Sequence, residues 1–502
     1  MSEKPNAVFQ PLYTADDVKL IERAAVAIAG YDLFELMQRA GQSAYNVMRD
    51  RWPNATNIAV VAGSGNNAGD GFILASLAQC DGLKVQVLYV NDTPEYRGDA
   101  LLAHDKLIAE SVKTDAFSKE HLKDVDVIVD GILGTGIKGH LRPRYENVIR
   151  IINDHKRMHT NVAVLALDIP SGLEADTGVI DPVALRSDHC VSFIDLKPGM
   201  VTGKAREYCP SWEVADLDIP HEARTEYSPI AWCDDAKKLV ADIPRRSKVA
   251  HKGNYGHLLL IGGDYGFGGA ILMAAQAAAR VGTGKLTILT RDSHVSPILS
   301  QLPEAMIRSI ETPADPILDE MLSSVDAVVI GPGLGQGEWG QRLITKVTQT
   351  LLPLLVDADG LNHLAKVNER NDNWVLTPHP GEAGRLLQTE TAEVETNRYS
   401  SVRSIQEQYS GVVVLKGAGT LVADAKYITV CTEGNPGMAT GGMGDILSGV
   451  IGAFLAQGYE STHAARLGVN LHAMAGDIAA EQGETGLLAT DLLEPLRQLV
   501  NH

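Results

Sequence analysis

Short apolar runs that end in glycine-rich or acidic turns recur along this sequence, and they restrict its fold more than any other feature. In the first half the runs NIAVVAGSG, VQVLYVND, VDVIVDGILGTG and NVAVLALDIPSG occupy residues 57–65, 85–92, 125–136 and 161–172. Each run is continuously apolar rather than alternating, which is typical of a parallel strand that helices cover on both faces. Helical segments separate the runs, so the sequence predicts a doubly wound α/β domain.

Helices are expected to precede the first of these strands. Thr14 and Asp17 form a capping-box pattern before VKLIERAAVAIA, and Gly30 is placed to end that helix. Asp32 with Glu35 is placed to begin a second helix. The chain is therefore expected to open with two helices.

A second set of strand and helix signals follows a polar stretch between about residues 215 and 250. The new runs are HLLLIGGDYGFGGA, KLTILT, VDAVVIGPGLG, LLVDADGLN, WVLTPHPGE and GVVVLKGAGT. Their motif order differs from that of the first half, so a fusion of two different domains is predicted rather than a duplication. We place the domains at residues 1–220 and 221–502, because 502 residues exceed one ordinary core.

Composition excludes some classes of partner. The net charge of −19 argues against nucleic acid or an anionic membrane as a general partner. The five cysteines are scattered and never spaced C-x-x-C, which fits a reduced compartment without disulfides or a zinc site. The sequence shows neither a signal-peptide pattern nor an apolar run of about 18 residues, so we expect a cytoplasmic protein.

Polar side chains cluster where the strands of the first half end. They are Asn66, Asn67, Asp70, Asp130, Asp168 and Ser171. Carboxyl ends of parallel strands line the ligand crevice of such a sheet, so these groups are expected to converge. All are oxygen ligands without histidine or cysteine, which favours an alkali or alkaline-earth cation. Taken singly, each could instead cap a helix or adopt a left-handed turn.

A second glycine loop, LGTGIKG, occupies residues 133–139. Its amides could bind phosphate, with Lys138 nearby.

The motifs NNAGDG, VDGILGTG and LDIPSG, in that order behind a helical segment, resemble the NAD(P)H-hydrate epimerase domain of bacterial bifunctional NAD(P)H-hydrate repair enzymes. The resemblance spans about residues 10–215 and implies a Rossmann-like three-layer sandwich. It also implies that potassium binds Asn67, Asp130 and Ser171 and that Asp168 acts on the hydrated nicotinamide ring. The implied contacts to the rest of the dinucleotide are Asn66, Asn67, Ala68, Gly69, Asp70, Gly134, Thr135, Gly136, Ile137, Lys138, Gly139 and His140.

Two features of this motif set bear on its chemistry. The family loop often reads NNGGDG, and Ala68 departs from it, which is tolerable unless the position needs positive φ. Epimerising the C6 hydroxyl requires only proton transfer as the ring opens or as water leaves and returns, and a carboxylate such as Asp168 can supply that.

In the second half, GGMGDILSG at residues 441–449 places free amides at a predicted helix N-terminus, which suits an anion. Asp445 at the start of this helix could act as a base. The pattern resembles the G-x-G-D signature of ribokinase-like phosphotransferases, although a glycine turn with an aspartate cap is the simpler alternative. The loop KGAGT at 416–420 suits a nucleotide phosphate.

The motifs GGDYGFGGA, GPGLG, DADGLN and TPHPGE together resemble the ADP-dependent NAD(P)H-hydrate dehydratase, over about residues 225–500. The resemblance implies a ribokinase-like domain that uses ADP, with Mg²⁺ expected for phosphoryl transfer. The implied nucleotide contacts are Lys416, Gly417, Ala418, Gly419, Thr420 and Gly444, and the implied contacts to the hydrated dinucleotide are Ala270, Gly333, His379 and Asp445. His379 lies between two prolines, so it could instead shape a turn.

The implied reaction is phosphorylation followed by elimination. Asp445 removes the proton of the C6 hydroxyl, ADP donates its terminal phosphoryl group, and phosphate leaves to restore the double bond. We therefore expect a cytoplasmic repair enzyme, working as a homo-oligomer on hydrated NADH or NADPH. Two alternatives remain at this stage: a ribokinase-superfamily small-molecule kinase fused to a dinucleotide-binding domain, and a non-catalytic dinucleotide sensor.

Overall fold

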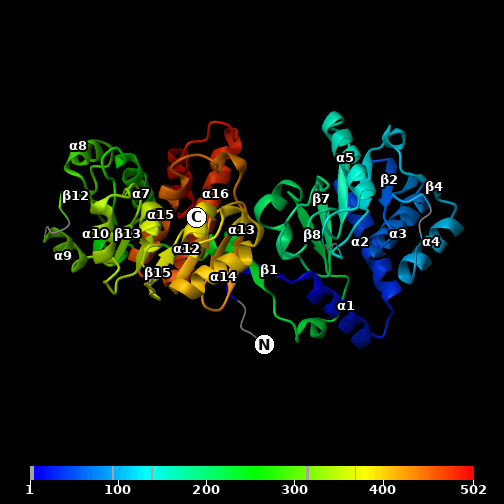
Figure 1. Ribbon diagram of the computed structural model, residues 1–502, viewed down its shortest axis with the longest axis horizontal. Coiled ribbons are helices and arrows are strands. Elements are labelled where there is room, and N and C mark those ends of the chain that lie inside the picture. The colour runs from blue at the N-terminus through cyan, green and yellow to red at the C-terminus, as the bar shows by residue number, and fades with distance from the viewer. Residues whose placement is uncertain (1–4, 93–94, 137–138, 313–315, 368, 502) are drawn as a thin grey trace. The chain divides into compact units, whose positions relative to one another are not determined.

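The computed structural model describes residues 5–92, 95–136, 139–312, 316–367 and 369–501. These residues divide into two compact units (Figure 1). One comprises residues 10–231, and the other comprises residues 5–9 together with 232–502. The sequence-based division at 220/221 lies shortly before this boundary.

The first unit is an alternation of helices and strands. Its elements in chain order are α1 (Ala15–Ala29), α2 (Leu33–Arg51), β2 (Asn57–Ala62), α3 (Asn66–Cys80), β3 (Lys84–Tyr89), α4 (Asp99–Ala109), β4 (Lys113–Ala116), β5 (Val127–Gly131), α5 (Pro143–Met158), β6 (Ala163–Leu167), β7 (His189–Phe193) and β8 (Trp212–Ala215). As expected, Thr14 and Asp32 cap α1 and α2, and Gly30 ends α1 in the left-handed region. The predicted helices and strands of this half are thus confirmed.

The described strands of the first unit form one seven-stranded sheet in the order β4-β3-β2-β5-β6-β7-β8. Every neighbouring pair is parallel. The chain runs outward from β2 to β4 and then returns to place β5 on the other side of β2. The strand order therefore reverses between β2 and β5, which is where ligands bind in open α/β sheets.

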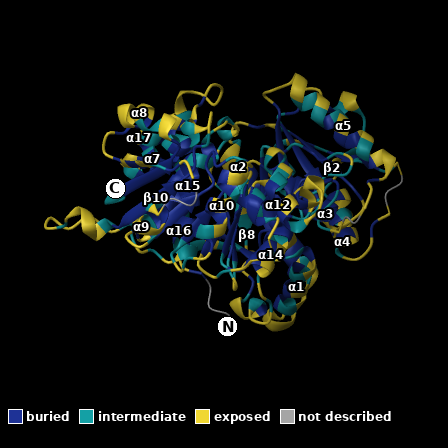
Figure 2. Cartoon of the chain, turned by 60° about the vertical axis from the view of Figure 1, so that its left-hand side comes forward, coloured by how far each residue is buried: buried dark blue, intermediate teal, exposed yellow. Residues whose placement is uncertain are grey.

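Both faces of this sheet are covered, which explains the continuous apolar runs. Ile58 and Val60 of β2 pack in a core with α2, α3 and α4, whereas Ala59 and Val61 pack in a second core with α5 (Figure 1). All four side chains are at most 1% exposed. Figure 2 shows the same pattern, with β2 buried between more exposed helices.

The second unit contains a larger sheet and more helices. Its elements are β9 (Ala231–Asp234), α6 (Ala236–Ala241), β10 (His257–Ile261), α7 (Gly268–Val281), β11 (Lys285–Thr290), α8 (Asp292–Gln301), β12 (Met306–Ser309), α9 (Ile317–Leu322), β13 (Ala327–Ile330), α10 (Glu338–Val347), β14 (Leu354–Val356), α11 (Ala358–Leu364), β15 (Trp374–Leu376), α12 (Pro380–Leu387), α13 (Thr391–Thr396), α14 (Arg398–Tyr409), β16 (Val412–Leu415), β17 (Thr420–Ala423), β18 (Ile428–Cys431), α15 (Met443–Ala456), α16 (Ser461–Ala479) and α17 (Leu493–Leu499).

Within the described chain, the second sheet has eleven strands in the order β1-β9-β18-β17-β16-β15-β14-β13-β10-β11-β12. Neighbours from β12 to β16 are parallel, as the apolar runs predicted, but β17 pairs antiparallel with both β16 and β18. One sequence expectation is wrong here. The chain does not open with a helix, because β1 (Val8–Leu12) precedes α1 and lies at the edge of this second sheet.

The main core of the second unit packs α7, α15 and α16 against the buried strands β10 and β13. Helices α7 and α15 approach closely, since a Cβ atom on Gly449 would lie only 2.0 Å from the carbonyl oxygen of Ala274. This contact fixes the position of α15, whose first turn carries Asp445.

Candidate active sites

A cavity of about 680 Å³ lies in the first unit where the strand order reverses. It is formed by the loops that follow β2, β5 and β6, together with α1 and α2. Eight of the residues singled out from the sequence line it: Asn66, Asn67, Asp70, Gly134, Thr135, Gly136, His140 and Asp168. The strand ends therefore converge as expected.

Other expected contact residues lie elsewhere. Ala68 and Gly69 are buried inside the first turns of α3, and neither they nor Gly139 line the cavity. Ile137 and Lys138 lie outside the described residues. The φ angle of Ala68 is not positive, so alanine in place of the family's glycine causes no backbone strain.

The loop between β2 and α3 brings backbone amides to the cavity. Helix α3 begins after Gly65 with no side-chain cap, which leaves its first N–H groups available to an anion. A Cβ atom at Gly63 would lie 1.8 Å from the carbonyl oxygen of Ile132. Glycine is thus required where the β2 and β5 loops touch.

Asn67, Asp130 and Ser171 meet around the backbone of Leu133. Asn67 Nδ2 donates to the Leu133 carbonyl (3.0 Å), and the Leu133 N–H donates to Ser171 Oγ (2.9 Å). Ser171 donates to Asp130 through both its hydroxyl (2.6 Å) and its backbone N–H (2.8 Å). Asp130 is fully buried, and this burial raises its pKa to about 6.

The other amide atom of Asn67 has no hydrogen-bond partner. Among the described residues, its buried Oδ1 is one of the few side-chain oxygens in this state. A buried carbonyl oxygen without a donor is costly unless something outside the chain satisfies it. This atom is therefore the clearest sign of a ligand beside Asp130 and Ser171.

Asp168 follows β6 with φ of 63°, in the left-handed region that non-glycine residues rarely adopt. Its carboxylate faces the cavity and forms an ion pair with Lys197, whose side chain is fully buried. Glu22 of α1 also lines the cavity. The sequence analysis missed both Lys197 and Glu22. A lysine two residues after the run CVSFID was a usable signal, whereas Glu22 lies on a helix with no motif.

The second unit has a cavity of about 440 Å³ at the carboxyl ends of β14, β15 and β16. Five of the residues singled out from the sequence line it: His379, Lys416, Gly417, Gly444 and Asp445. The neighbours Ala418, Gly419 and Thr420 continue the same loop but do not line it. Asp357 and Glu382 do, although only the motifs around them were noted.

In this cavity a lysine lies between two carboxylates. Lys416 Nζ donates to Asp357 Oδ1 (2.7 Å) and lies 3.9 Å from Glu382 Oε2. Ser448 Oγ, from α15, donates to the other Asp357 oxygen (2.7 Å). Burial opposes ionisation of Asp357, but the Lys416 ammonium holds the pKa of this carboxyl below its ordinary value. The lysine is thereby fixed with its Nζ next to Gly444, at 3.4 Å from where a Cβ atom on that glycine would lie.

Asp445 lies in the first turn of α15. Burial, followed by repulsion from Asp357, raises the pKa of Asp445 to about 7. A carboxyl group with this pKa can accept a proton near neutral pH, which suits a general base. The aspartate lines the cavity, and Gly442 rather than Asp445 occupies the N-cap position of α15.

His379 both caps α12 and lines the cavity. The ring Nδ1 of His379 accepts from the Gly381 backbone N–H (3.0 Å). The backbone N–H of His379 donates to Glu382 Oε2 (2.9 Å). The turn-shaping role considered from the sequence is therefore present, and the half-exposed ring still faces the cavity.

Ala270 and Gly333 lie side by side, outside the residues that line this cavity. A Cβ atom on Gly333 would be 3.3 Å from that of Ala270. The loop before α7 is held here because the Asp264 N–H donates to the Gly333 carbonyl (2.7 Å).

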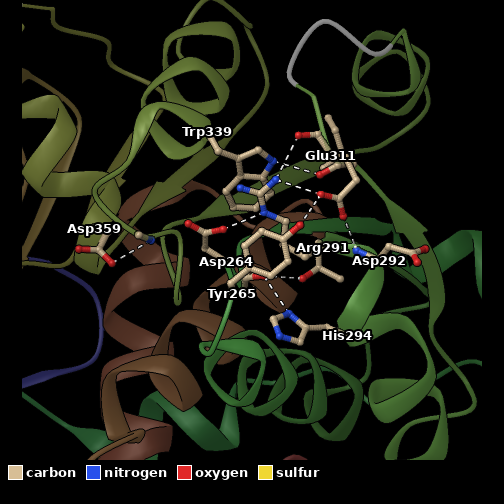
Figure 3. Close-up of polar contacts among 12 residues, drawn as sticks. Asp264, Tyr265, Arg291, Asp292, His294, Glu311, Trp339 and Asp359 are labelled. Atoms are coloured by element: carbon tan, nitrogen blue, oxygen red, sulfur yellow. Dashed lines mark hydrogen bonds and ion pairs between the residues drawn. The ribbon is translucent and has the colours of Figure 1, made fainter.

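Arg291 secures the same loop (Figure 3). Its Nε donates to Asp264 Oδ1 (2.7 Å), and its guanidinium lies 4.6 Å from the ring centre of Tyr265 and 4.2 Å from that of Trp339. Glu311 accepts from both Arg291 and Tyr265. The network holds the GGDYGFGGA loop in place.

The described part of the chain contains no group of three or more His, Cys, Asp or Glu side chains placed to hold a metal ion. None of its described helices is both long enough and apolar enough to cross a membrane.

Comparison with known proteins agrees with this two-part organisation. Residues 33–199 match the model described as YjeF-related protein N-terminus, and residues 258–498 match the model described as NAD(P)H-hydrate dehydratase. A bifunctional NAD(P)H-hydrate repair enzyme of Coxiella burnetii is 44% identical, over 98% of this chain and 99% of that protein. The corresponding enzyme of Escherichia coli is 40% identical, over 100% and 96%.

A solved structure gives the fold of the second unit. A ribokinase-like superfamily protein from Enterococcus faecalis is 30% identical with a TM-score of 0.50 and covers 53% of this chain and 94% of its own.

Proposed function

The chain belongs to the family of bifunctional NAD(P)H-hydrate repair enzymes, and from that premise we propose which residues perform each of its two activities. The enzyme epimerises and dehydrates hydrated NADH and NADPH, with an epimerase part followed by a ribokinase-like dehydratase part. We assign epimerisation of the R and S hydrates to residues 1–220. Dehydration of the S hydrate is assigned to residues 221–502.

In the epimerase part, the hydrated dinucleotide occupies the 680 Å³ cavity. The amides at the start of α3 and the loop at Gly134–Gly136 bind its phosphates, because helix N-termini and glycine-rich turns present N–H donors to anions. Asp168 faces the same space from the end of β6 and exchanges protons at the C6 hydroxyl.

Potassium fits the group formed by Asn67, Asp130 and Ser171. The support is the buried Asn67 Oδ1 that lacks a donor, next to a fully buried carboxylate. Amide, carboxylate and hydroxyl oxygens are ligands that hard cations prefer. The bound ion supplies positive charge that satisfies these oxygens and holds the β2 and β5 loops together.

In the dehydratase part, Asp445 removes the proton of the C6 hydroxyl as the phosphoryl group is transferred from ADP. The nucleotide lies along Lys416, Gly417, Ala418, Gly419, Thr420 and Gly444. The hydrated ring lies between Asp445 and His379, with the dinucleotide extending toward Ala270 and Gly333. Phosphate then leaves C6, because phosphate is a far better leaving group than hydroxide, and the ring double bond is restored.

Mg²⁺ is proposed to arrive with the nucleotide, since it usually binds phosphates and one or two carboxylates. A carboxylate donor is present, because Glu382 lines the cavity that Lys416 faces. The ion supplies charge that stabilises the transferred phosphoryl group.

One observation carries the dehydratase assignment: Asp445 lies at the N-terminus of α15 with a pKa of about 7, in the cavity that Lys416 lines. The test is to incubate the enzyme with S hydrate and ADP and to measure AMP, phosphate and restored NADH. We expect one AMP and one free phosphate per NADH.

The alternatives give different results in the same assay. A small-molecule kinase would leave the phosphoryl group on its product, and a sensor would bind the hydrate without turnover. Either result would overturn the proposal.

The setting of the enzyme is also proposed. A cytoplasmic location is supported by the five cysteines, all of them free. We further propose a homo-oligomer, for which the exposed Leu101, Leu102 and Ile108 on α4 offer an apolar surface. Light scattering tests it, and a monomer at micromolar concentration would refute it.

A further inference from the structure

Arg142 is an exposed arginine at the rim of the epimerase cavity. Its two basic neighbours in the sequence have carboxylate partners. His140 Nδ1 lies 3.0 Å from Asp181 Oδ1, and Arg144 Nη1 donates to Asp92 Oδ2 (2.7 Å). The guanidinium of Arg142, by contrast, forms no hydrogen bond or ion pair with any described residue. Its five N–H donors are therefore available to a ligand.

Helix α5 holds Arg142 near the loop that follows β2. Arg142 is the N-cap residue of α5, and Tyr145 lies in the first turn of the same helix. The Tyr145 hydroxyl lies 3.4 Å from Ser64 Oγ and accepts from Asn91 Nδ2 (3.1 Å). Since Ser64 follows β2 and Asn91 follows β3, the start of α5 is anchored at the ends of these two strands.

The strand order separates this anchor from Asp168. The carboxyl ends of β3, β2, β5 and β6 follow one another along the edge of the sheet, and Asp168 comes directly after β6. Neighbouring strands lie about 4.8 Å apart, so about 10 Å separates the end of β2 from the end of β6. The proposed phosphate-binding groups, at the start of α3 and at Gly134–Gly136, follow β2 and β5. A dinucleotide with its hydrated ring at Asp168 therefore extends its adenosine toward the start of α5.

Acidic side chains line the cavity from other elements. The described acids that line it are Glu22 of α1, Asp70 of α3, Asp99 of α4 and Asp168. Helices α3 and α4 cover one face of the sheet, whereas α5 covers the other. The segment 132–145, which leads into α5, contains no acidic residue. A phosphate on the ligand is therefore repelled by the acids and attracted to Arg142.

A second exposed arginine, Arg23, lines the cavity on the acidic side. It lies on α1 next to Glu22. Burial raises the pKa of Glu22, and the charge of Arg23 opposes this rise, so the two side chains interact. The charge of Arg23 is thus offset by a neighbouring carboxylate, and position distinguishes the two arginines.

We propose that Arg142 binds the 2′-phosphate on the adenosine ribose of hydrated NADPH and makes the epimerase prefer hydrated NADPH to hydrated NADH. The two substrates differ only in this phosphate, so a residue that contacts it changes their relative rates without contacting the hydrated ring. A guanidinium can bind a phosphate through two parallel N–H donors, which an ammonium cannot reproduce. The inference rests on the proposed binding of the dinucleotide in this cavity.

The test measures epimerisation of the purified R hydrates of NADPH and NADH by separating the two epimers. ADP is left out, potassium is saturating and ionic strength is constant. Wild-type enzyme should have a kcat/KM at least about tenfold higher for hydrated NADPH. Arg142→Gln should lower kcat/KM for hydrated NADPH about 10- to 100-fold, mainly through a higher KM, because a charge-assisted hydrogen bond to bound substrate is lost. The kcat/KM for hydrated NADH should change little.

Arg23→Gln is the matched control, since Arg23 is also an exposed arginine that lines the cavity. It should leave the ratio of the two kcat/KM values unchanged. Arg142→Lys should restore only part of the preference, because it returns the charge without the paired donors. Thermal unfolding of each variant shows whether a lost rate reflects lost structure.

The outcomes separate this inference from the proposed function. Equal loss of kcat/KM for both hydrates in Arg142→Gln, or a wild-type enzyme that does not distinguish them, would overturn the role of Arg142 while epimerisation remains measurable. A ratio that changes in Arg23→Gln and not in Arg142→Gln would place the 2′-phosphate on the acidic side and would also overturn it. If wild-type enzyme interconverts the epimers of neither hydrate, the epimerase assignment itself fails.

Discussion

Asp130, Asp168 and Asp445 are the same side chain in three environments, and their surroundings decide what each can do. Asp130 is buried among hydrogen-bond donors from Ser171 and Ile132. Asp168 is paired with an ammonium, and Asp445 is buried near another carboxylate. A ligand site, an ion-paired carboxylate and a neutral-pH base therefore follow from burial and neighbouring side chains rather than from residue type.

Replacing Asn67 should weaken potassium binding more than it changes any other property of the enzyme. In Asn67→Leu, two methyl groups replace the buried Oδ1 and the Nδ2 donor to Leu133 with similar branching, so the potassium concentration for half-maximal epimerisation should rise at least about 10-fold. The measurement is epimerisation rate against potassium, at constant ionic strength with tetramethylammonium. The neighbouring Asn66→Leu is the matched control and should leave the potassium requirement unchanged. Equal potassium curves for wild type and Asn67→Leu would refute the assignment.

Dehydration should depend on pH through Asp445. A base must be ionised to accept a proton, and the pKa of Asp445 is about 7, so kcat/KM for S hydrate should fall as pH decreases below 7. Well below that pKa the decrease should approach about tenfold per pH unit. The profile is measured with a blank for spontaneous decay of the hydrate. A rate that stays constant down to pH 5.5 would contradict the role of Asp445.

At residue level, the sequence predicted the functional side chains that lie in motifs, because glycine-rich loops and strand ends can be recognised in the sequence. Asn67, Asp168, Lys416 and Asp445 all proved to line a cavity. Lys197 and Asp357 were missed as functional residues, because their importance depends on partners 29 and 59 positions away in the chain. Distance along the chain hides such ion pairs from motif analysis.

The helices and strands were easier to predict than their arrangement. Continuous apolar runs gave the parallel strands, since a strand covered on both faces has no polar side. The strand β1 was missed because VFQPL is short, contains proline and lies at a sheet edge, where burial is incomplete. The antiparallel pairing of β17 was missed because pairing direction depends on the turn between strands, not on their apolar composition.

The contact between α7 and α15 makes a testable element-level prediction. A Cβ atom at Gly449 would lie 2.0 Å from the Ala274 backbone, so Gly449→Ala should separate the helices and destabilise the second unit by about 1–3 kcal/mol. The measurement is urea unfolding of the full chain. Gly269→Ala on α7 is the control, because nothing lies within 4 Å of its added Cβ. Equal stability of the two variants would show that the helices can move apart freely.

On the scale of the whole molecule, each cavity is built from residues of one compact unit alone. Asp168 and its partners belong to the first unit, and Asp445 and Lys416 belong to the second. The two chemistries also have different needs, since epimerisation requires proton exchange and dehydration requires a nucleotide. The two activities should therefore be separable by single substitutions.

The most direct test of this account is one incubation of mixed R and S hydrates with ADP, using wild-type enzyme, Asp168→Asn and Asp445→Asn, with both epimers and AMP followed over time. Wild-type enzyme should consume both epimers. Asp168→Asn should consume S hydrate with matching AMP and leave R hydrate to decline only at its spontaneous rate, whereas Asp445→Asn should interconvert the epimers without forming AMP. Loss of both activities in either variant, with the protein still folded, would contradict two separate sites.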